Sequence, residues 1–566
     1  MRATYGRGDP GRLGGALQRC RRRHRTIHAV RSCDVAEGPN LRGPKAKAVL
    51  PEGPNLRGPK AKAVLPEGPN LRGPKAKAVL LGVLGAIAIA PPAGAAELLV
   101  LERDGAVTVR EDPFLPAAQP EPQARASRPD RGGAKPRARA AETKRTVRGE
   151  LRRLESAGKL SSAEHDRYRG QYDRAEETVR RLEGARRANL GAVIDTLEDL
   201  TARGRLASSR APVLFETLER NRQWWTEGTL IPSGRRVSFA GSELVWQHYG
   251  GEGLQIQWLG TFGRANALFS GREYDARLRS LLAEAAPLAT VRAGGLGWES
   301  LFAFGDGEPP WVSGLTQGTA AQAYSRGAIR LQDGAFMTVG REALGVFGRR
   351  APVGVWGGTS THAHYLQYSY DDDLRIYNGF VQALNGIYDF AKLANDDPAR
   401  ALFARGEAQL RRALERGDLD TGGWSRYSNR SDSSLHYHGV LRDFLRGLCQ
   451  RLGEGRVAAD PAPYCALAER FTADLTRPPV IDLRSRAATG GRPKAITFTA
   501  DKPVTVTMTV ARGSDVVERV TRSVRAGRPQ VTWDEPRREG TYTVTLATTD
   551  PAGNRATERG ELRVSR

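Results

Sequence analysis

Hydrophobic positions recur at helical spacing through most of the chain. From about residue 144 to 226, leucine, valine and tyrosine lie three, four and seven residues apart with charged residues between them, which indicates amphipathic helices. Further helices are predicted from about 264 to 475, and the clearest cover 313–329, 374–394, 398–416, 435–452 and 462–474. Because the connections are short, this succession favours an α/α toroid or incomplete barrel, in which helix pairs ring a central cleft.

Two stretches alternate hydrophobic and polar residues, as strands do. Leu254, Ile256 and Trp258 alternate with glutamines inside 237–260, which predicts a small β region before the helical ring. Near the C-terminus, AITFTA (495–500), VTVTMTV (504–510) and YTVTLATT (542–549) are rich in Thr and Val. Residues 480–566 are therefore expected to form a small β-sandwich, and they resemble bacterial immunoglobulin-like domains. The predicted fold class is multi-domain and mainly α, with these two β regions.

The N-terminal part has the composition of a leader. The unit EGPNLRGPKAKAVL begins at residues 37, 52 and 67, and it lacks the hydrophobic content that stacked repeats need. The last copy runs into an apolar segment at 78–90 and an Ala-x-Ala exit at Ala93 and Ala95, which is typical of a secretory signal. The apolar segment is too short for a transmembrane span. Export is therefore predicted, to the cell envelope or beyond, with no stable membrane span in the mature protein.

These changes in pattern divide the chain into five predicted regions. They are a leader with tandem repeats and signal peptide at 1–96, a disordered linker at 97–143, a helical N-terminal region at 144–236, the main helical domain at 237–476 and the β-sandwich at 480–566. The linker prediction rests on a Pro/Ala/Arg-rich segment without periodicity at 116–142.

The net charge of +24 is distributed unevenly. Residues 1–95 alone contain 18 Lys and Arg against 5 Asp and Glu, so the presumed folded part is only mildly basic. This distribution argues against nucleic acid and suits an anionic polysaccharide as partner. Cys449 and Cys465 lie near the end of the main domain, and the sequence leaves open whether they form a disulfide or stay free thiols. No metal-ligand spacing such as CxxC is present, and no metal site is predicted.

Four segments between 311 and 441 contain residues suited to sugar-acid chemistry. They are WVSGLTQG (311–318), YNGFVQALNGIYDF (377–390), DTGGWSRY (420–427) and LHYHGVL (435–441). In this order and at this spacing they resemble the C-terminal catalytic domain of the D-glucuronyl C5-epimerases, which invert glucuronate to iduronate within heparosan-type chains. The resemblance covers about 240–475 and implies a carbohydrate epimerase that needs no cofactor.

The resemblance also implies roles for particular residues. Tyr368, Tyr427 and Tyr437 fall where the family has functional tyrosines, and Arg430 falls where it has a substrate-contacting arginine. The family usually has a glutamate, implicated in proton transfer, just before the first of these tyrosines, whereas this chain has Gln367. A glutamine cannot serve as a carboxylate base. The predicted substrate-binding residues are Arg430, His438, Gln367, Trp311, Gln317 and Asn378.

These residue types fit proton transfer at C5 of a uronate. Removal of the C5 proton builds negative charge on the adjacent carboxylate, so the intermediate needs a cation or hydrogen-bond donors there. Arg430 is the predicted carboxylate ligand, and its charge would lower the pKa of Tyr427 from the ordinary tyrosine value of about 10. Tyr437 and Tyr368 are the predicted acid/base groups on the two ring faces, with His438 as a substitute base.

Each of these residues also has a structural interpretation. A tyrosine on an amphipathic helix more often packs than reacts, and Trp311 would more often be core than a residue that stacks on sugar. The acidic run Asp371–Asp373 is expected to cap a helix that begins at Leu374 rather than to bind a cation.

The sequence thus predicts an exported enzyme similar to a uronic-acid polysaccharide C5-epimerase. A polysaccharide lyase, which shares the C5 deprotonation but expels the C4 oxygen, is the alternative enzyme. A non-catalytic extracellular glycan-binding protein is the alternative from another class, and Gln367 favours it. Glycine pairs such as Gly294–Gly295 follow no dinucleotide-binding pattern, so no cofactor is predicted. The identity of the polysaccharide and the formation of a homo-oligomer are left open.

Overall fold

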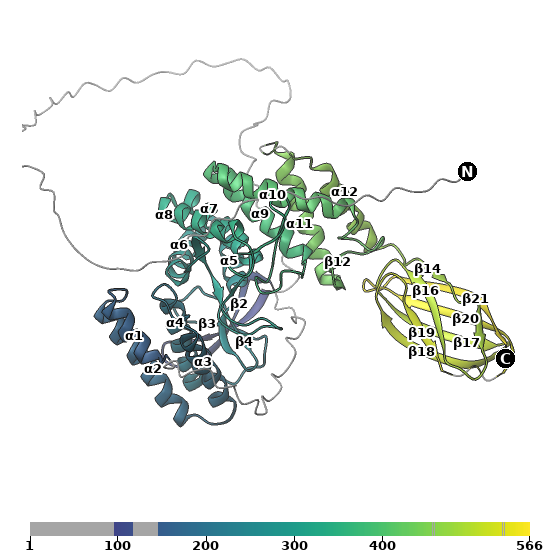
Figure 1. Cartoon of the computed structure of the whole chain (residues 1–566), viewed down its shortest axis with the longest axis horizontal. Coiled ribbons are helices and arrows are strands. Elements are labelled where there is room, and N and C mark those ends of the chain that lie inside the picture. Colours follow the sequence, from purple (N-terminus) through teal and green to yellow (C-terminus); the bar gives the residue numbers. More distant parts are fainter. Residues whose placement is uncertain are drawn as a thin grey trace, which may run out of the picture. The chain divides into compact units, whose positions relative to one another are not determined.

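The computed structural model describes residues 95–116, 145–455, 457, 459–534, 536 and 538–565. Along these residues helices and strands follow one another in mixed order, with the labels of Figure 1. The predicted tandem repeats, signal segment and most of the predicted linker lie outside the described residues. The described part is a multi-domain structure that mixes helices and sheets.

A five-stranded sheet comes first. Its strands are β1 (Ala95–Leu101), β2 (Val107–Pro116), β3 (Arg236–Phe239), β4 (Trp246–Tyr249) and β5 (Gly253–Ile256), in the order β2-β1-β3-β4-β5. β1 runs parallel to β3, whereas the other neighbours are antiparallel. The last three strands lie in the region where strands were predicted, but Trp258, which the alternation included, begins helix α5 (Trp258–Leu268) instead.

The hairpin β1–β2 corrects part of the predicted linker. Residues 97–116 belong to the sheet, while 117–144 lie outside the described residues. Gly105 lies in the turn with φ of +85°, which glycine adopts without a Cβ penalty. Leu98 and Val100 are buried with Val245 in a small apolar cluster. The sequence therefore contained an alternating strand and an Asp-Gly turn, but the Pro-rich composition that follows obscured them.

Four helices form the N-terminal helical region: α1 (Val147–Ser156), α2 (Ser162–Arg181), α3 (Gly184–Ala202) and α4 (Ala211–Glu227). α2 begins with a capping box, in which the Ser161 hydroxyl and the Glu164 carboxylate satisfy each other's backbone N–H groups. Tyr168 on α2 stacks on Phe215 of α4, with 4.6 Å between ring centroids. The apolar faces of these helices belong to the same buried cluster as the helices that follow. One core therefore supports both helical parts.

Eight further helices make up the main helical part: α5 (Trp258–Leu268), α6 (Asp275–Ala285), α7 (Gly314–Leu331), α8 (Gly334–Ala343), α9 (Tyr377–Ala394), α10 (Asp397–Glu415), α11 (Leu435–Gly453) and α12 (Ala462–Asp474). The ends of α7, α9, α10, α11 and α12 differ from the predicted ends by three residues or fewer. Hydrophobic periodicity was therefore a reliable guide for these helices.

α7 and α9 approach each other closely because both carry glycine at their contact. A Cβ on Gly318 would lie 2.7 Å from the Ala383 Cα, and a Cβ on Gly386 would lie 2.0 Å from the Gly318 carbonyl oxygen. Any larger residue would force the two backbones apart. Two glycines of the recognised segments thus serve helix packing.

Buried charges join α7, α9 and α11. The Asp389 carboxylate on α9 accepts hydrogen bonds from Arg326 and Gln322 on α7, at 2.8 and 2.7 Å, and from Arg451 on α11, at 2.7 and 3.0 Å. Burial by itself would raise the pKa of Asp389, but the charges of Arg451 and Arg326 outweigh it and hold that pKa well below its usual range. We call Asp389, Arg326 and Arg451 the buried ion network.

Short strand pairs connect the helices. They are β6 (Thr290–Arg292) with β7 (Gly295–Gly297), β8 (Glu299–Ser300) with β9 (Trp311–Val312), β10 (Trp356–Gly358) with β11 (Ala363–Tyr365), and β12 (Arg426–Ser428) with β13 (Ser431–Asp432). The sequence patterns missed them, because strands of two or three residues are too short to show alternation.

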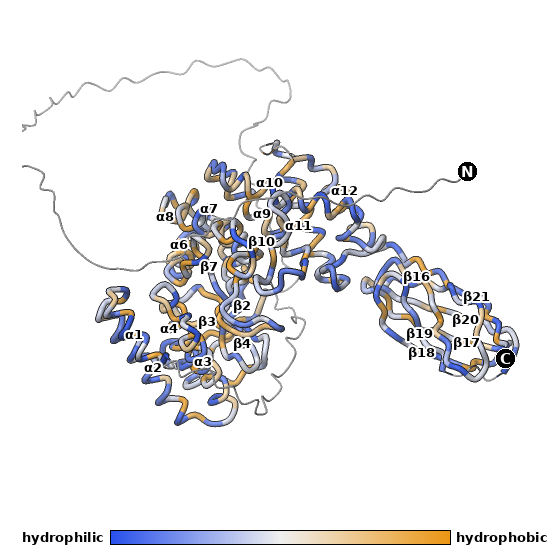
Figure 2. The backbone as a smooth tube through the Cα atoms, viewed as in Figure 1, coloured by the Kyte–Doolittle hydropathy of each residue, from blue (hydrophilic) through white to orange (hydrophobic). Residues whose placement is uncertain are grey.

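Two sheets form the C-terminal part. Their strands are β14 (Ile481–Leu483), β15 (Ala487–Thr489), β16 (Lys494–Ala500), β17 (Val504–Arg512), β18 (Asp515–Val524), β19 (Gln530–Trp533), β20 (Gly540–Thr549) and β21 (Arg555–Ser565), in the orders β14-β16-β19 and β15-β21-β20-β17-β18. Side chains from both sheets, such as Phe498 and Leu546, share one core of their own. Hydrophobic and hydrophilic residues mix along these strands in Figure 2. The two layers have the arrangement of a β-sandwich, and the likeness to immunoglobulin-like domains stays a prediction.

A disulfide joins Cys449 on α11 to Cys465 on α12, which decides between the two states that the sequence left open. Within the described ranges, no helix combines the length and the apolar character needed to cross a membrane.

Candidate functional site

A pocket lies where residues of β4 and β5 meet the first turns of α5 and α7. It contains about 510 Å³ of empty space, part of which is open solvent. Its lining is uncharged and consists of Tyr249, Ile256, Gln257, Trp258, Leu259, Ser300, Phe302, Phe304, Trp311, Ser313, Leu315, Thr316, Gln367 and Tyr368. Aromatic walls with a few hydroxyl and amide groups are typical of a small-molecule or sugar site.

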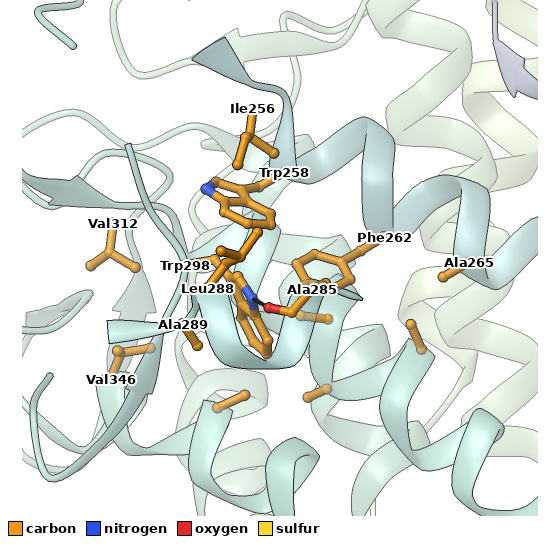
Figure 3. Close-up of a cluster of buried hydrophobic side chains, with 14 of the residues drawn as sticks. Ile256, Trp258, Phe262, Ala265, Ala285, Leu288, Ala289, Trp298, Val312 and Val346 are labelled. Carbon is orange, nitrogen blue, oxygen red and sulfur yellow. Dashed lines mark hydrogen bonds between the residues drawn. The ribbon is translucent and has the colours of Figure 1, made fainter. Parts of the chain in front are cut away.

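The hydrophobic core fixes the wall of this pocket at Trp258. The Trp258 ring stacks on Phe262 at 6.0 Å, and Phe262 meets Trp298 edge to face at 4.6 Å, as Figure 3 shows. The Trp258 indole N–H donates to the Glu299 carbonyl oxygen at 3.0 Å, and the Trp298 indole N–H donates to that of Ala285 at 2.9 Å. With ring packing and hydrogen bonds both satisfied, this side of the pocket is pre-formed.

Tyr368 and Trp311 lie together on the pocket wall. The Tyr368 ring centroid is 5.6 Å from those of both Phe304 and Trp311. Trp311 is only 6% exposed, and its indole N–H donates to the Phe302 carbonyl oxygen at 2.9 Å. Trp311 is therefore both a buried residue and a lining residue, so the two interpretations of it do not exclude each other.

Gln367 contacts Tyr368 directly. Its amide nitrogen donates to the Tyr368 hydroxyl oxygen at 3.2 Å. Its carbonyl oxygen is buried and has no hydrogen-bond donor among the described residues. This oxygen lies against Gly379 on α9, where a Cβ would come within 2.4 Å of it. Gly379 thus leaves room for the Gln367 amide.

Four tyrosines continue from the pocket along the protein, and we call Tyr368, Tyr370, Tyr427 and Tyr437 the tyrosine row. Tyr370 stacks on Tyr368 at 5.4 Å, and Tyr427 lies 4.8 Å from Tyr437. Burial raises the pKa of Tyr370, and the nearby Asp371, Asp306 and Tyr427 raise it further. Tyr427 therefore lies near enough to Tyr370 to affect its pKa.

Tyr370 was missed by the sequence interpretation. Gly307 makes room for it, because a Cβ there would lie 2.3 Å from the Tyr370 ring. The alternation Tyr368-x-Tyr370 was the only signal in the sequence, and it carries no information on what either ring contacts. Phe302, Phe304 and Tyr249 were missed for the same reason.

Arg430 is engaged by a carboxylate of the protein itself. Its guanidinium donates to both carboxylate oxygens of Asp371, at 2.8 and 3.1 Å, and its side chain is 53% exposed. The hydrogen bond to Asp371 raises the pKa of Arg430, and the charges of Asp371, Asp373 and Asp306 add to the effect. The structure therefore places this arginine among acidic groups.

The predicted helix cap at Asp371–Asp373 is wrong. α9 begins at Tyr377 rather than Leu374, and its N-cap Ile376 offers no side-chain hydrogen bond. Asp371 instead accepts from the backbone N–H groups of Asp373 and Leu374, at 3.2 and 3.0 Å, so it closes a turn.

Two predicted substrate ligands, Gln317 and His438, are structural, and both are 0% exposed. The Gln317 side-chain oxygen accepts from the backbone N–H of Trp298, and the Gln317 side-chain nitrogen donates to the carbonyl oxygens of Leu296 and Ala343. With its hydrogen bonds directed into the protein, Gln317 has no free group for a sugar.

The ring of His438 bonds to Ser425 through Nδ1 and to the Phe471 carbonyl oxygen through Nε2. Burial lowers the pKa of His438 to about 4, so the ring is neutral at neutral pH. The expectation that His438 contacts substrate or replaces a base is therefore corrected, because the ring has no contact left to offer.

Asn378, the remaining predicted ligand, is 6% exposed on α9 and is not a lining residue of the pocket. Its side-chain oxygen has no donor in the described part of the chain.

The turn that carries Tyr427 is held from both sides. Trp424 stacks on His438 with 3.8 Å between ring centroids, and the Lys502 ammonium lies 5.5 Å from the Trp424 ring centroid. Lys502 is itself 0% exposed and pairs with Asp550 at 2.9 Å. A buried lysine of the C-terminal part and His438 of α11 therefore both lie next to Trp424.

Comparisons with known proteins agree with the resemblance. Residues 296–457 match the family model described as D-glucuronyl C5-epimerase C-terminus. No curated protein matches the chain. A solved structure described as an engineered protein is similar at 16% identity over 55% of this chain and 75% of that chain, with a TM-score of 0.14. That score supports no inference about fold.

Proposed function

We propose that the protein is a uronic-acid polysaccharide C5-epimerase, with the tyrosine row and its adjoining pocket as the active site. The observation that carries the proposal is the contact between Tyr368 and the pocket, inside a segment that matches the epimerase domain family. The alternation of aromatic walls with hydroxyl groups suits a sugar ring, whose two faces are apolar and whose rim is polar.

The reaction requires two groups that exchange protons with C5. A tyrosinate oxygen takes the C5 proton while the electron pair of the C–H bond moves onto the carboxylate. A second tyrosine then gives its hydroxyl proton to the opposite face of C5 and becomes a tyrosinate, so that C5–H is the only bond of the sugar that breaks. We assign the pocket-side role to Tyr368 and the other to Tyr427 or Tyr437, the pair at the far end of the row.

Gln367 shapes this assignment. Because it lacks a carboxylate, it cannot accept the proton. Its N–H, 3.2 Å from the Tyr368 oxygen, would instead stabilise the phenolate after the hydroxyl proton leaves. Tyr368 would then act as the base, next to the position where the family has a glutamate and this chain has Gln367.

Two coarser expectations belong to the same proposal. Helix pairs such as α7 with α9 and α9 with α11 suit an α/α toroid around the site. The Cys449–Cys465 disulfide suits export, because disulfides persist mainly in oxidising compartments. Mass spectrometry of the protein secreted by its native host would test export, and recovery only from the reduced interior would contradict it.

The test is proton exchange on defined polymers. The purified protein is incubated in D₂O with heparosan, alginate or polygalacturonate, and C5 deuterium is measured by mass spectrometry and NMR. Deuterium at C5 without chain cleavage is expected on one polyuronate, whereas heat-treated protein should give none.

The other outcomes identify the alternatives. Absorbance near 230 nm would indicate the unsaturated product of a lyase and overturn the epimerase assignment. Binding to a polyuronate with no exchange on any of them would favour the non-catalytic glycan-binding protein, in agreement with Gln367.

A further inference from the structure

The pocket end of the tyrosine row contains unused hydrogen-bond donors at the start of α7. Ser313 and Thr316 both line the pocket and are 8% and 7% exposed. The Ser313 hydroxyl oxygen accepts from the Thr316 backbone N–H at 3.3 Å, which leaves the hydroxyl proton of Ser313 to donate elsewhere. The Thr316 hydroxyl has no hydrogen bond within the described residues, although the side chain is more than nine-tenths buried and faces the pocket.

The electrostatics at this point favour an anion. α7 is 18 residues long, and the N-terminus of such a helix carries a partial positive charge. The Gly314 N–H already donates to the Leu366 carbonyl oxygen and the Thr316 N–H to the Ser313 hydroxyl oxygen, so the hydroxyl groups of Ser313 and Thr316 are the donors considered for an anion. α5 also begins at the pocket, where its N-cap Gln257 is a lining residue. None of the lining residues is charged, so no carboxylate of the protein repels or competes with an incoming anion.

The other end of the row offers the opposite situation. Arg430, the arginine that the sequence assigned there, already donates to both carboxylate oxygens of Asp371. Asp373 and Asp306 lie near enough to raise the pKa of Arg430 as well. A substrate carboxylate would have to displace Asp371 and would still meet the two other acidic groups. The free energy of such an exchange is small, because one carboxylate replaces another.

We propose that the pocket binds the carboxylate of a uronate residue at the start of α7, with the Thr316 and Ser313 hydroxyls as donors. The sugar ring then packs on Trp311, and C5, which is bonded to the carboxylate carbon, faces Tyr368. Donors to the carboxylate also stabilise the charge that builds there when the C5 proton leaves. This proposal rests on the proposed function, and it replaces the carboxylate ligand that the sequence predicted, Arg430, with the start of α7.

The experiment compares two forms of one ligand. Binding of a heparosan oligosaccharide and of its carboxyl-reduced form is measured by calorimetry for the wild type and for Thr316→Val, which keeps the side-chain shape and removes the hydroxyl. Loss of a hydrogen bond to a charged group predicts roughly tenfold or greater weakening for heparosan, with little change for the reduced form. Thr316→Ser, which restores a hydroxyl, should recover most of the affinity.

Thr319→Val is the matched control, because Thr319 lies one turn further along α7 and its hydroxyl donates to the Leu315 carbonyl oxygen at 2.8 Å. It should leave the ratio of the two affinities unchanged. Thermal melting of each variant shows whether it folds. If Thr316→Val does not fold, the wild type still tests the proposal, because equal affinity for heparosan and for its carboxyl-reduced form would overturn it.

The outcomes separate this proposal from the proposed function. If the wild type exchanges C5 deuterium, and Arg430→Gln loses the preference for heparosan over its carboxyl-reduced form while Thr316→Val keeps it, the carboxylate site at α7 is overturned. The proposed epimerase function is then left intact. A wild type that neither binds nor exchanges on any polyuronate overturns the proposed function itself. Selective loss in Thr316→Val with exchange in the wild type supports both.

Discussion

The two ends of the tyrosine row are built on different principles. At the pocket end, Tyr368 is set among buried aromatic rings, and the Thr316 hydroxyl, which has no hydrogen bond within the described residues, faces an uncharged cavity. At the other end, Tyr427 and Tyr437 are half-buried, and Arg430 is exposed and already paired with Asp371. The first end is prepared for a ligand, whereas the second end has satisfied its own charge.

This difference shows why residue type alone misleads. Arginine is the residue that chemistry assigns to a carboxylate, and it is correct to look for one near an enolate-like intermediate. An arginine that already holds a carboxylate has little binding free energy left for another. A threonine hydroxyl that is buried without a partner has more binding free energy to offer, because the cost of its desolvation was already incurred when the chain folded.

The largest expected effect separates the ends by chemistry. Tyr368→Phe removes the phenol oxygen next to the pocket, so C5 deuterium incorporation should fall about 10²- to 10⁴-fold, the usual contribution of a positioned acid or base. Tyr427→Phe and Tyr437→Phe tell which partner serves the opposite face, because only one of them should fall as far. Tyr542→Phe in the C-terminal part, whose hydroxyl bonds to the Arg538 carbonyl oxygen, is the control and should exchange at the wild-type rate. Equal loss in all four variants would contradict the assignment.

The next effect tests the buried ion network that joins α7, α9 and α11. Asp389→Asn leaves the buried guanidinium groups of Arg326 and Arg451 without a carboxylate, which should lower the free energy of unfolding by about 3 to 5 kcal/mol. Urea unfolding followed by circular dichroism at 222 nm, which reports mainly on the helices, is the measurement. Asp443→Asn, which breaks the partly exposed pairs with Arg442 and Arg446, should cost less than about 1 kcal/mol. Comparable losses in the two variants would mean that the buried ion network is not the main support.

The third effect concerns the other end and depends on pH. The pKa of His438 is lowered from its ordinary 6.5 to about 4 in the folded protein, so the unfolded chain binds the extra proton first as the pH falls. Its contribution to stability is therefore fully present above pH 6.5 and is lost as the pH falls through about 4, by up to about 1.4 kcal/mol per pH unit.

His438→Gln should accordingly flatten the fall in melting temperature between pH 7 and pH 5. His362→Gln, in a loop where the ring bonds to the neighbouring Thr361, is the control and should keep the wild-type slope. Parallel pH profiles for the wild type and His438→Gln would show that the buried ring does not determine this part of the stability.

The smallest expected effect tests whether the exposed ion pair matters. Asp371→Asn frees Arg430 but removes a pair that is 53% and 26% exposed, so the free energy of unfolding should change by less than about 1 kcal/mol. Heparosan affinity should change less than in Thr316→Val. A tenfold gain in affinity on freeing Arg430 would reverse the contrast between the two ends and make the arginine the carboxylate ligand.

Local patterns in the sequence predicted much of the fold. Helical periodicity located α7, α9, α10, α11 and α12, and alternation located the region of β3–β5 and the C-terminal strands β16, β17 and β20, because such repeats report which face of an element is buried. It did not locate the strand pairs of two or three residues, nor the hairpin at 95–116, where a Pro-rich neighbour outweighed the alternation.

For the candidate site, the sequence by itself determined which residues were worth attention and which domain family they resemble. Tyr368, Tyr427 and Tyr437 were found by type and spacing, and the family model at 296–457 agrees with the resemblance. Only the tertiary structure decided which of them face a pocket and that Tyr370 stacks on Tyr368. It also decided that the side chains of Gln317 and His438 are engaged in hydrogen bonds within the protein.

The physical reason is that burial and pairing depend on contacts between distant segments. Asp371 and Arg430 are 59 residues apart, and Gln317 meets Trp298 from another element, so no local pattern records either contact. A side chain's chemistry is written in the sequence, but whether that chemistry is still available to a ligand is decided by what folds against it.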